Sequence, residues 1–207
     1  MNQPLLITDC DEVLLHMVSH FGAWLDEAHD IRFALDHHDF GRALTRGRDG
    51  TTVPAEEVWP LLDGFFATEM HRQTIVPHAR EALTAISREA DIVVLTNLGE
   101  HCHASRVAQL EAVGIRHRVI CNQGGKGRPV ARLIAELEPS VAVFVDDLPQ
   151  HHESVAKHAP DVWRLHMVAE PLMAAHVAPA PHAHARIDDW SIAREWVLDR
   201  FAARAAA

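Results

Sequence analysis

The chain has 207 residues, of which 48% are hydrophobic and 23% are charged, so it can bury a core and is not a disordered or low-complexity protein. Its 29 acidic and 19 basic residues give a formal net charge of -10, which argues against nucleic acid as a partner. The three cysteines are scattered, and the sequence shows no signal-peptide pattern. No apolar run approaches the ~18 residues that span a bilayer. These features predict a cytoplasmic protein with no membrane partner.

The first predicted element is a short buried strand, Leu5 to Ile7, and a helical insert follows it. Residues 14–77 contain no convincing strand pattern, and their apolar spacing predicts a first helix over about 14–28 and a second that begins near Pro54. We therefore predict a small, all-helical cap over residues 14–77. Its own core is predicted to contain Trp24, Trp59, Phe65 and Phe66.

The rest of the chain predicts alternating strands and helices. Continuous apolar runs rich in β-branched residues, typical of strands covered on both faces, occur at 92–95, 119–121, 141–145 and 162–165. Apolar residues at helical spacing separate these runs, and residues 169–184 are interpreted as a surface connection before a last helix. The pattern predicts a Rossmann-like α/β core, residues 1–13 and 78–207, with a parallel sheet flanked by helices. The apolar stripe of the last helix fits either its own sheet or a second copy, so monomer and homodimer both remain open.

Two pairs of aspartates stand where predicted strands end. Asp9 and Asp11 flank Cys10 after the first strand, and Asp146 and Asp147 follow the run at 141–145. Carboxylates crowded at one sheet edge need a counter-charge, and oxygen ligands suit Mg²⁺, which also takes phosphate oxygens. This pattern predicts a Mg²⁺ site and a phosphate ester as the substrate. The Cys10 side chain should point away from the two carboxylates and into the core.

Three further residues are candidate phosphate contacts. Thr96 and Asn97 end the strand at 92–95, and Lys126 follows two glycines at the start of a predicted helix. Hydrogen-bond donors at strand ends and a lysine beside a helix N-terminus both favour an anion.

These residues form four motifs in the order found in the haloacid dehalogenase superfamily, which the chain resembles. The motifs are Asp9-Cys10-Asp11-Glu12-Val13, Thr96 at the end of its strand, Lys126, and the pair Asp146-Asp147. The resemblance covers residues 1–13 and about 78–166. Glu12 stands where a glycine is usual, and His151 stands where many relatives carry Asp or Asn.

Most members of that superfamily are phosphohydrolases, and the resemblance implies their mechanism for this chain. Asp9 would be the nucleophile that forms an aspartyl-phosphate, and Asp11 would protonate the leaving group and then deprotonate water. Mg²⁺ would be bound by Asp9, the backbone carbonyl of Asp11, and Asp147, with Asp146 as a direct or outer ligand. Thr96, Asn97 and Lys126 would hold the phosphoryl oxygens of a small phosphorylated metabolite.

Several alternatives remain open at this point. A phosphomutase would pass the aspartyl-phosphate to a sugar hydroxyl, and a metal-free haloacid dehalogenase would lack an acid at position 11. The 17 histidines, with pairs such as His151-His152, also allow a non-catalytic metal-binding or interaction protein. The irregular spacing of the histidines disfavours a zinc site. We therefore predict a Mg²⁺-dependent phosphatase.

Overall fold

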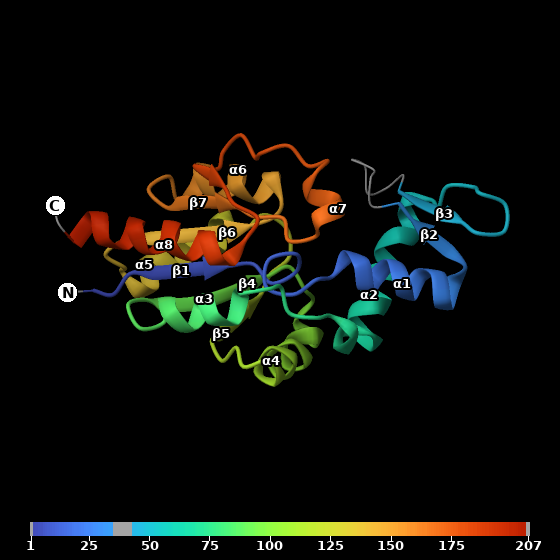
Figure 1. Cartoon of the computed structure of the whole chain (residues 1–207), viewed down its shortest axis with the longest axis horizontal. Helices are drawn as coiled ribbons and strands as arrows, with labels where there is room; N and C mark the ends of the chain where they lie inside the picture. Colours follow the sequence, from blue (N-terminus) through green and yellow to red (C-terminus); the bar gives the residue numbers. More distant parts are fainter. Residues whose placement is uncertain (1, 35–42, 206–207) are drawn as a thin grey trace.

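The computed structural model describes residues 2–34 and 43–205, and a six-stranded parallel sheet forms its centre (Figure 1). The strand order is β5-β4-β1-β6-β7-β8, so β1 lies between β4 and β6. This confirms the predicted parallel α/β fold. The strands are β1 (Leu5–Thr8), β4 (Asp91–Thr96), β5 (Arg118–Cys121), β6 (Ala142–Asp146), β7 (Trp163–His166) and β8 (Ala185–Arg186).

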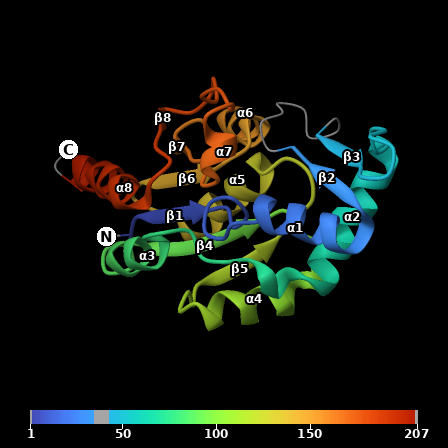
Figure 2. The same cartoon turned by 45° about the vertical axis from the view of Figure 1, so that its right-hand side comes forward.

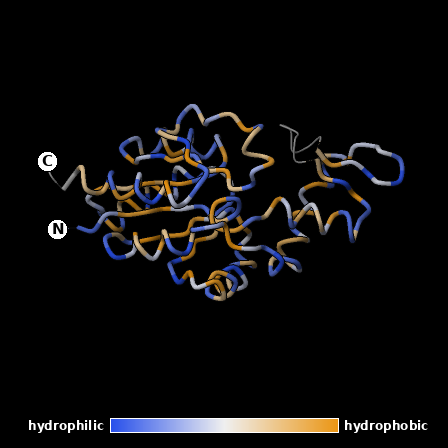
Figure 3. Tube along the Cα trace, in the orientation of Figure 1, coloured by the Kyte–Doolittle hydropathy of each residue, from blue (hydrophilic) through white to orange (hydrophobic). Residues whose placement is uncertain are grey.

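Both faces of the central strands are buried, because the side chains of β1, β4 and β6 alternate between two hydrophobic clusters. Leu5 and Ile7 of β1 join one cluster with Val130 and Val155, while Leu6 joins the other. Figure 3 shows the hydrophobic colour running along these central strands. The flanking helices are α3 (Ala79–Ile86), α4 (His103–Ala112), α5 (Gly127–Leu137), α6 (Pro149–His158), α7 (Pro171–Ala174) and α8 (Trp190–Ala205), with a 3-10 turn η2 (Glu100–Cys102). Helices α5 and α6 pack against each other beside one cluster, and α3 and α8 pack beside the other.

The last helix, α8, docks on the chain's own core. Trp190 is fully buried, and its indole Nε1 donates a hydrogen bond of 2.7 Å to the carbonyl of Val13. Ala193, Val197 and Phe201 are buried in the same cluster. The apolar stripe of this helix is therefore occupied within the chain, and the oligomeric state stays a prediction.

We expect Trp190→Ala to lower the free energy of unfolding by about 3–5 kcal/mol, because it leaves a cavity and an unpaired carbonyl at Val13. Urea unfolding followed by circular dichroism measures this change. As the control, Ile192→Ala on the exposed face of α8 should change stability by less than about 0.5 kcal/mol. Equal losses in the two variants would contradict the docking of α8 through Trp190.

The segment between β1 and α3 forms a smaller unit beside the carboxyl end of the sheet (Figure 2). It contains α1 (Val18–His29), β2 (Ile31–Phe33), β3 (Leu44–Arg46), α2 (Ala55–Thr68) and a 3-10 turn η1 (Met70–Arg72). We refer to this segment as the cap. Residues 35–42, which belong to the predicted cap, lie outside the described part of the chain. The predicted boundaries at residues 13 and 77 stay a prediction.

The prediction of an all-helical cap was wrong, because β2 and β3 pair as a two-stranded antiparallel sheet. Each strand has only three residues, which is too short for an alternating pattern to stand out from the sequence. Helix α2 begins at Ala55, one residue after the predicted start at Pro54. Trp24, Phe65 and Phe66 belong to the cap's hydrophobic cluster, but Trp59 is 65% exposed and does not.

None of the helices within 2–34 and 43–205 combines the length and the apolarity required for crossing a membrane.

Candidate active site

The candidate site lies where β1 and β6 end side by side. Asp9 directly follows β1, and its backbone N–H donates a hydrogen bond of 2.8 Å to the carbonyl of Val145 in β6. Asp146 is the last residue of β6, and Asp147 follows it. Because the two strands are parallel neighbours, their carboxyl ends bring all three carboxylates to one place.

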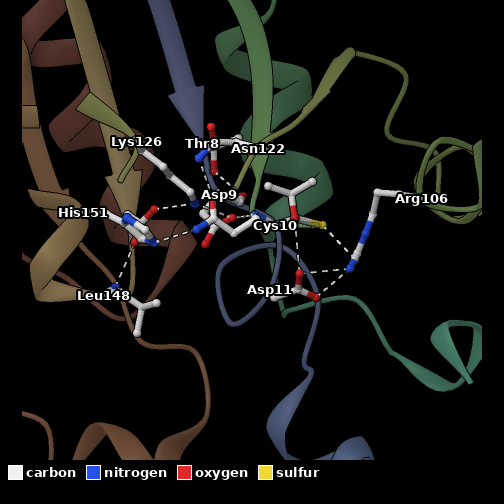
Figure 4. Close-up of polar contacts among 12 residues, drawn as sticks. Thr8, Asp9, Cys10, Asp11, Arg106, Asn122, Lys126, Leu148 and His151 are labelled. Atoms are coloured by element: carbon white, nitrogen blue, oxygen red, sulfur yellow. Dashed lines mark hydrogen bonds and ion pairs between the residues drawn. The ribbon is translucent and has the colours of Figure 1, made fainter. Parts of the chain in front are cut away.

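A buried lysine lies between two of these carboxylates (Figure 4). The Nζ of Lys126 is 2.7 Å from Oδ1 of Asp9 and 2.7 Å from Oδ2 of Asp146, and the lysine side chain is fully buried. Burial opposes the charged form of Lys126, but the two aspartates outweigh it and raise the pKa of the lysine. Lys126 therefore stays positively charged within the cluster.

Lys126 reaches this position through a tight loop and a close helix contact. Gly124 has a φ of +83°, which favours glycine, and Lys126 immediately precedes α5. A Cβ at Gly127 would lie 2.0 Å from the carbonyl oxygen of Ser154 in α6, so this glycine allows α5 and α6 to approach closely. The loop and the first turn of α5 thus place the lysine over the ends of β1 and β6.

The oxygens of Asp9 and Asp146 are held in fixed directions. Oδ1 of Asp9, which contacts Lys126, also accepts a hydrogen bond of 2.7 Å from the backbone N–H of Cys10. Oδ1 of Asp146 accepts from the backbone N–H of Leu148 at 2.9 Å. Both of these contacts of Asp9 are made through Oδ1.

The cluster carries more negative charge than one lysine balances. The pKa of Asp9 is raised to about 7, mainly by burial and also by the charges of Asp146 and Asp11, while Lys126 opposes the rise. Burial also raises the pKa of Asp147, reinforced by the charges of Asp146 and Asp9. Without another positive charge, one of these carboxyls retains its proton in the neutral pH range.

Asp9, Asp146 and Asp147 also fit a divalent cation. One oxygen from each carboxylate can be chosen so that all three lie within 4.8 Å of one another. Carboxylate oxygens are hard ligands of the kind that Mg²⁺ prefers, and a cation there would supply the missing positive charge. The donor set and the excess negative charge therefore both fit Mg²⁺.

The predicted phosphate contacts lie around this cluster. Thr96 is buried at the end of β4, and its hydroxyl donates to Oδ2 of Asp11 at 3.3 Å. Asn97 is exposed and bridges to the lysine loop, because its Nδ2 donates to the carbonyl of Gly124 at 2.9 Å. Nε2 of His151 is 3.3 Å from the same amide nitrogen. The phosphate-binding roles of Thr96, Asn97 and Lys126 stay predictions.

Asp11 is turned toward a different partner from that of Asp9. Nη2 of Arg106 lies 2.8 and 2.9 Å from the two oxygens of Asp11, and Nε2 of Gln73 donates to Oδ1 at 2.7 Å. Figure 4 shows Asp11 facing Arg106 while Asp9 faces Lys126. The structure thus gives the two aspartates of the first motif separate cationic partners.

Arg106 and Gln73 are two site residues that were not predicted from the sequence. Arg106 follows Cys102 by four residues and precedes Leu110 by four, and all three are buried. This i, i+4, i+8 spacing places a charge on the buried face of a helix, which is the one signal that could have identified Arg106. Gln73 lies in the irregular segment after η1 and carries no comparable pattern.

Comparison with known proteins gives a clear result for structure only. No family model matches the sequence, and no curated protein is significantly similar to it. Among solved structures, a haloacid dehalogenase-like family hydrolase from Xanthomonas campestris has a TM-score of 0.60 at 16% identity, covering 100% of this chain and 99% of the other. The chain has the haloacid dehalogenase-like fold.

Two further similar structures carry names that mention magnesium or a phosphatase activity of those proteins. A hydrolase of this kind from Bacillus subtilis, described as bound to magnesium, has a TM-score of 0.65 at 10% identity and covers 95% of this chain and 99% of its own. A predicted phosphoglycolate phosphatase from Haemophilus somnus has a TM-score of 0.61 at 12% identity, with 93% and 97% covered. At these identities the similarity is one of fold.

Glu12, which replaces the glycine usual in the haloacid dehalogenase-like motif, keeps the backbone conformation that glycine favours. Its φ is +58°, a left-handed conformation that costs a non-glycine residue about 1 kcal/mol. Its Oε1 accepts from the backbone N–H groups of Met17 and Val18 at 2.7 Å each, at the start of cap helix α1. Burial raises the pKa of Glu12 to about 7, although these two hydrogen bonds lower it. The departure therefore joins the first motif to the cap through a side chain.

Cys10 and the histidines next to the acidic pair have structural surroundings. Cys10 is fully buried in the hydrophobic cluster, which fits the predicted packing role, and burial raises the pKa of its thiol. The prediction that its side chain points away from both carboxylates was wrong, because its sulfur and Asp11 contact the same guanidinium of Arg106. His152 is also fully buried, and its Nε2 lies 2.9 Å from the carbonyl of Asp146. His166 lies 2.8 Å from the carbonyl of Asp147 through Nε2, and its Nδ1 accepts from Ala180. These two histidines support the backbone of the acidic pair.

We expect His152 to make the metal-free protein less stable in acid. Burial lowers the pKa of His152 to about 4, so below its unfolded value of 6.5 the unfolded chain takes up a proton that the folded chain excludes. The stability that this group contributes is present above pH 6.5 and is lost as the pH falls toward 4. In urea unfolding with EDTA, the stability advantage of the wild type over His152→Gln should shrink by up to about 3 kcal/mol between pH 7 and pH 4.

Asp9 and Glu12 also change stability over this pH range, in the opposite direction. Both proteins contain these residues, so their contributions cancel in the comparison and the difference reports on His152. The raised pKa values of Asp9 and Glu12 stabilise the fold as the pH falls below about 7. A difference that stays constant over this pH range would contradict the lowered pKa of His152.

Proposed function

We propose that the protein is a Mg²⁺-dependent phosphatase that hydrolyses a small phosphorylated metabolite in the cytoplasm through an aspartyl-phosphate at Asp9. The observation that carries this proposal is the buried Lys126 between Asp9 and Asp146, with Asp147 beside them. A nucleophilic carboxylate, a fixed cation and a divalent-metal site within a few ångströms are what phosphoryl transfer needs. The haloacid dehalogenase-like fold and its phosphatase-named neighbours support the same reaction class.

In the first step of the proposed reaction, a carboxylate oxygen of Asp9 attacks phosphorus. A new bond forms between this oxygen and phosphorus, and the bond from phosphorus to the ester oxygen breaks. Asp11 must carry a proton for this step, and it gives that proton to the departing oxygen, so the product leaves as an alcohol. Lys126 and Thr96 hold the oxygens of the phosphoryl group during the transfer.

In the second step, water attacks the phosphorus of the aspartyl-phosphate. Asp11 takes the proton of this water, inorganic phosphate leaves, and the carboxylate of Asp9 is restored. Asp9, Asp147 and the backbone carbonyl of Asp11 would hold Mg²⁺, with Asp146 as a direct or outer ligand. The bound cation would neutralise charge on the phosphoryl oxygens.

The enclosure of the site supports a small substrate. The side chain of Asp9 is 8% exposed and that of Asp11 is 15% exposed. A cap that opens for binding and closes for reaction would also exclude bulk water. The carboxyl of Asp11 disfavours a metal-free dehalogenase, which by the resemblance lacks an acid at this position.

The experiment is a hydrolysis assay with a generic aryl phosphate and a panel of small metabolite phosphates. We expect phosphate release by the wild type with Mg²⁺ and a loss of release with EDTA, restored by added Mg²⁺. A haloacid incubated in parallel should release no halide. No turnover of any phosphate ester by a folded protein that binds Mg²⁺ would overturn the proposal and leave a binding protein as the reading.

A further inference from the structure

Arg106 is an arginine buried at the boundary of core and cap, and its charge is matched by one carboxylate. Its side chain has an exposure of 0%, and its Nη2 contacts both oxygens of Asp11 at 2.8 and 2.9 Å. Its Nη1 contacts the sulfur of Cys10 at 3.1 Å. Burying a guanidinium is costly unless an anion pairs with it, so Arg106 and Asp11 depend on each other.

The contacts of this ion pair reach both parts of the molecule. Arg106 belongs to core helix α4, yet its guanidinium lies 5.7 Å from the ring centre of Phe66 in cap helix α2. Gln73, just beyond the cap's last turn, donates to Asp11 at 2.7 Å. Gln109, one turn along α4 from Arg106, contacts both the carbonyl of Met70 and Oε1 of Gln73. The carboxylate of Asp11 is therefore fixed from α4 and from the segment that leaves the cap.

The two aspartates of the first motif contact different cationic side chains. Asp9 is held by Lys126 and Asp11 is held by Arg106, so the two carboxylates point to different cations (Figure 4). Thr96 completes the environment of Asp11 with a hydroxyl contact at 3.3 Å. A carboxylate with three fixed partners loses the freedom to rotate toward or away from a leaving group.

We propose that Arg106 is a positioning residue that holds the carboxylate of Asp11 where the ester's leaving oxygen departs. The inference rests on the proposed function and deepens it, because it concerns how Asp11 serves the departing alcohol. Arg106 acts through Asp11 and does not itself contact the reacting phosphoryl group. Its loss should therefore matter most for esters whose leaving group needs a proton.

Two aryl phosphates of nearly equal shape test this. Phenyl phosphate has a poor leaving group, and para-nitrophenyl phosphate has a good one that departs without protonation. For Arg106→Gln we expect kcat/KM to fall by about 10²-fold with phenyl phosphate and by less than about 10-fold with para-nitrophenyl phosphate. Arg106→Lys should recover part of the loss with phenyl phosphate, because its ammonium can still donate a hydrogen bond that holds the carboxyl of Asp11.

A double variant separates positioning from a general structural defect. Adding Arg106→Gln to Asp11→Asn should cause no further loss with phenyl phosphate, because Arg106 has no carboxylate left to position. Arg118→Gln is the matched control, since Arg118 is exposed, pairs with Glu136 and lies at the opposite end of the sheet. It should leave both rates unchanged.

Each result decides for or against the inference. Equal losses with the two esters, or losses that multiply in the double variant, would overturn the role of Arg106 and leave the proposed function standing. If the wild type hydrolyses neither these esters nor any in the panel, the proposed function fails and the inference fails with it. Should Arg106→Gln not fold, Arg106→Lys and Gln73→Ala carry the test, with the same greater loss expected for phenyl phosphate.

Discussion

Asp9→Asn should lower kcat/KM for phosphate ester hydrolysis by at least about 10³-fold, because an amide oxygen does not displace the ester oxygen from phosphorus. Asp9 directly follows β1, and one of its oxygens is fixed by Lys126 and a backbone N–H. The rate is measured under saturating Mg²⁺ for the wild type and the variant.

The matched control for this substitution is Asp91→Asn. Asp91 is the exposed first residue of β4, at the end of the sheet opposite the candidate site. The control variant should keep the wild-type rate and stability. An Asp9→Asn protein that is folded and retains more than about a tenth of the wild-type kcat/KM would rule out Asp9 as the nucleophile.

Lys126→Met should lower the free energy of unfolding of the metal-free protein by about 3–5 kcal/mol, since it removes one partner of a buried ion pair. The lysine is fully buried and lies 2.7 Å from both Asp9 and Asp146, which would face each other without a cation. The same change should abolish hydrolysis. Urea unfolding in EDTA measures the stability term.

Two comparisons make this second prediction specific to charge. Lys157→Met, on the exposed surface of α6, should change stability by less than about 0.5 kcal/mol. Adding Asp146→Asn to Lys126→Met should recover part of the loss, because it removes one of the unbalanced charges. A Lys126→Met protein as stable as the wild type would contradict the buried ion-pair cluster.

The sequence predicted the parts of the fold that depend on buried strands. The apolar runs at 5–7, 92–95 and 141–145 are covered on both faces, so their sequence pattern is continuous and easy to recognise. The polar residues that follow them, including Asp9 and Asp146, mark the strand ends, and parallel topology brings those ends together. The acidic cluster could therefore be predicted without a structure.

The parts that escaped prediction depend on contacts between distant segments. The strands β2 and β3 have three residues each, and their paired residues are 11 to 15 positions apart, so neither strand shows a period. Arg106 is 95 residues from Asp11 and lies on a helix whose pattern indicates only a buried face. No local spacing states which carboxylate such an arginine will meet.

Glu12 illustrates how a departure from a motif can be compensated. The sequence shows only that a glutamate replaces a glycine. In the structure the residue keeps a positive φ, and its carboxylate accepts the first N–H groups of α1. The substitution therefore adds a contact between the first motif and the cap.

The most direct test of the central claim is to trap the covalent form of Asp9. The protein is mixed with Mg²⁺ and an aryl phosphate, quenched in acid during turnover, reduced with borohydride and digested for mass spectrometry. We predict that the peptide containing Asp9 carries one phosphoryl group before reduction and that Asp9 is converted to homoserine after it. Turnover with an unmodified Asp9, or with the phosphoryl group on another residue such as His151, would contradict the account.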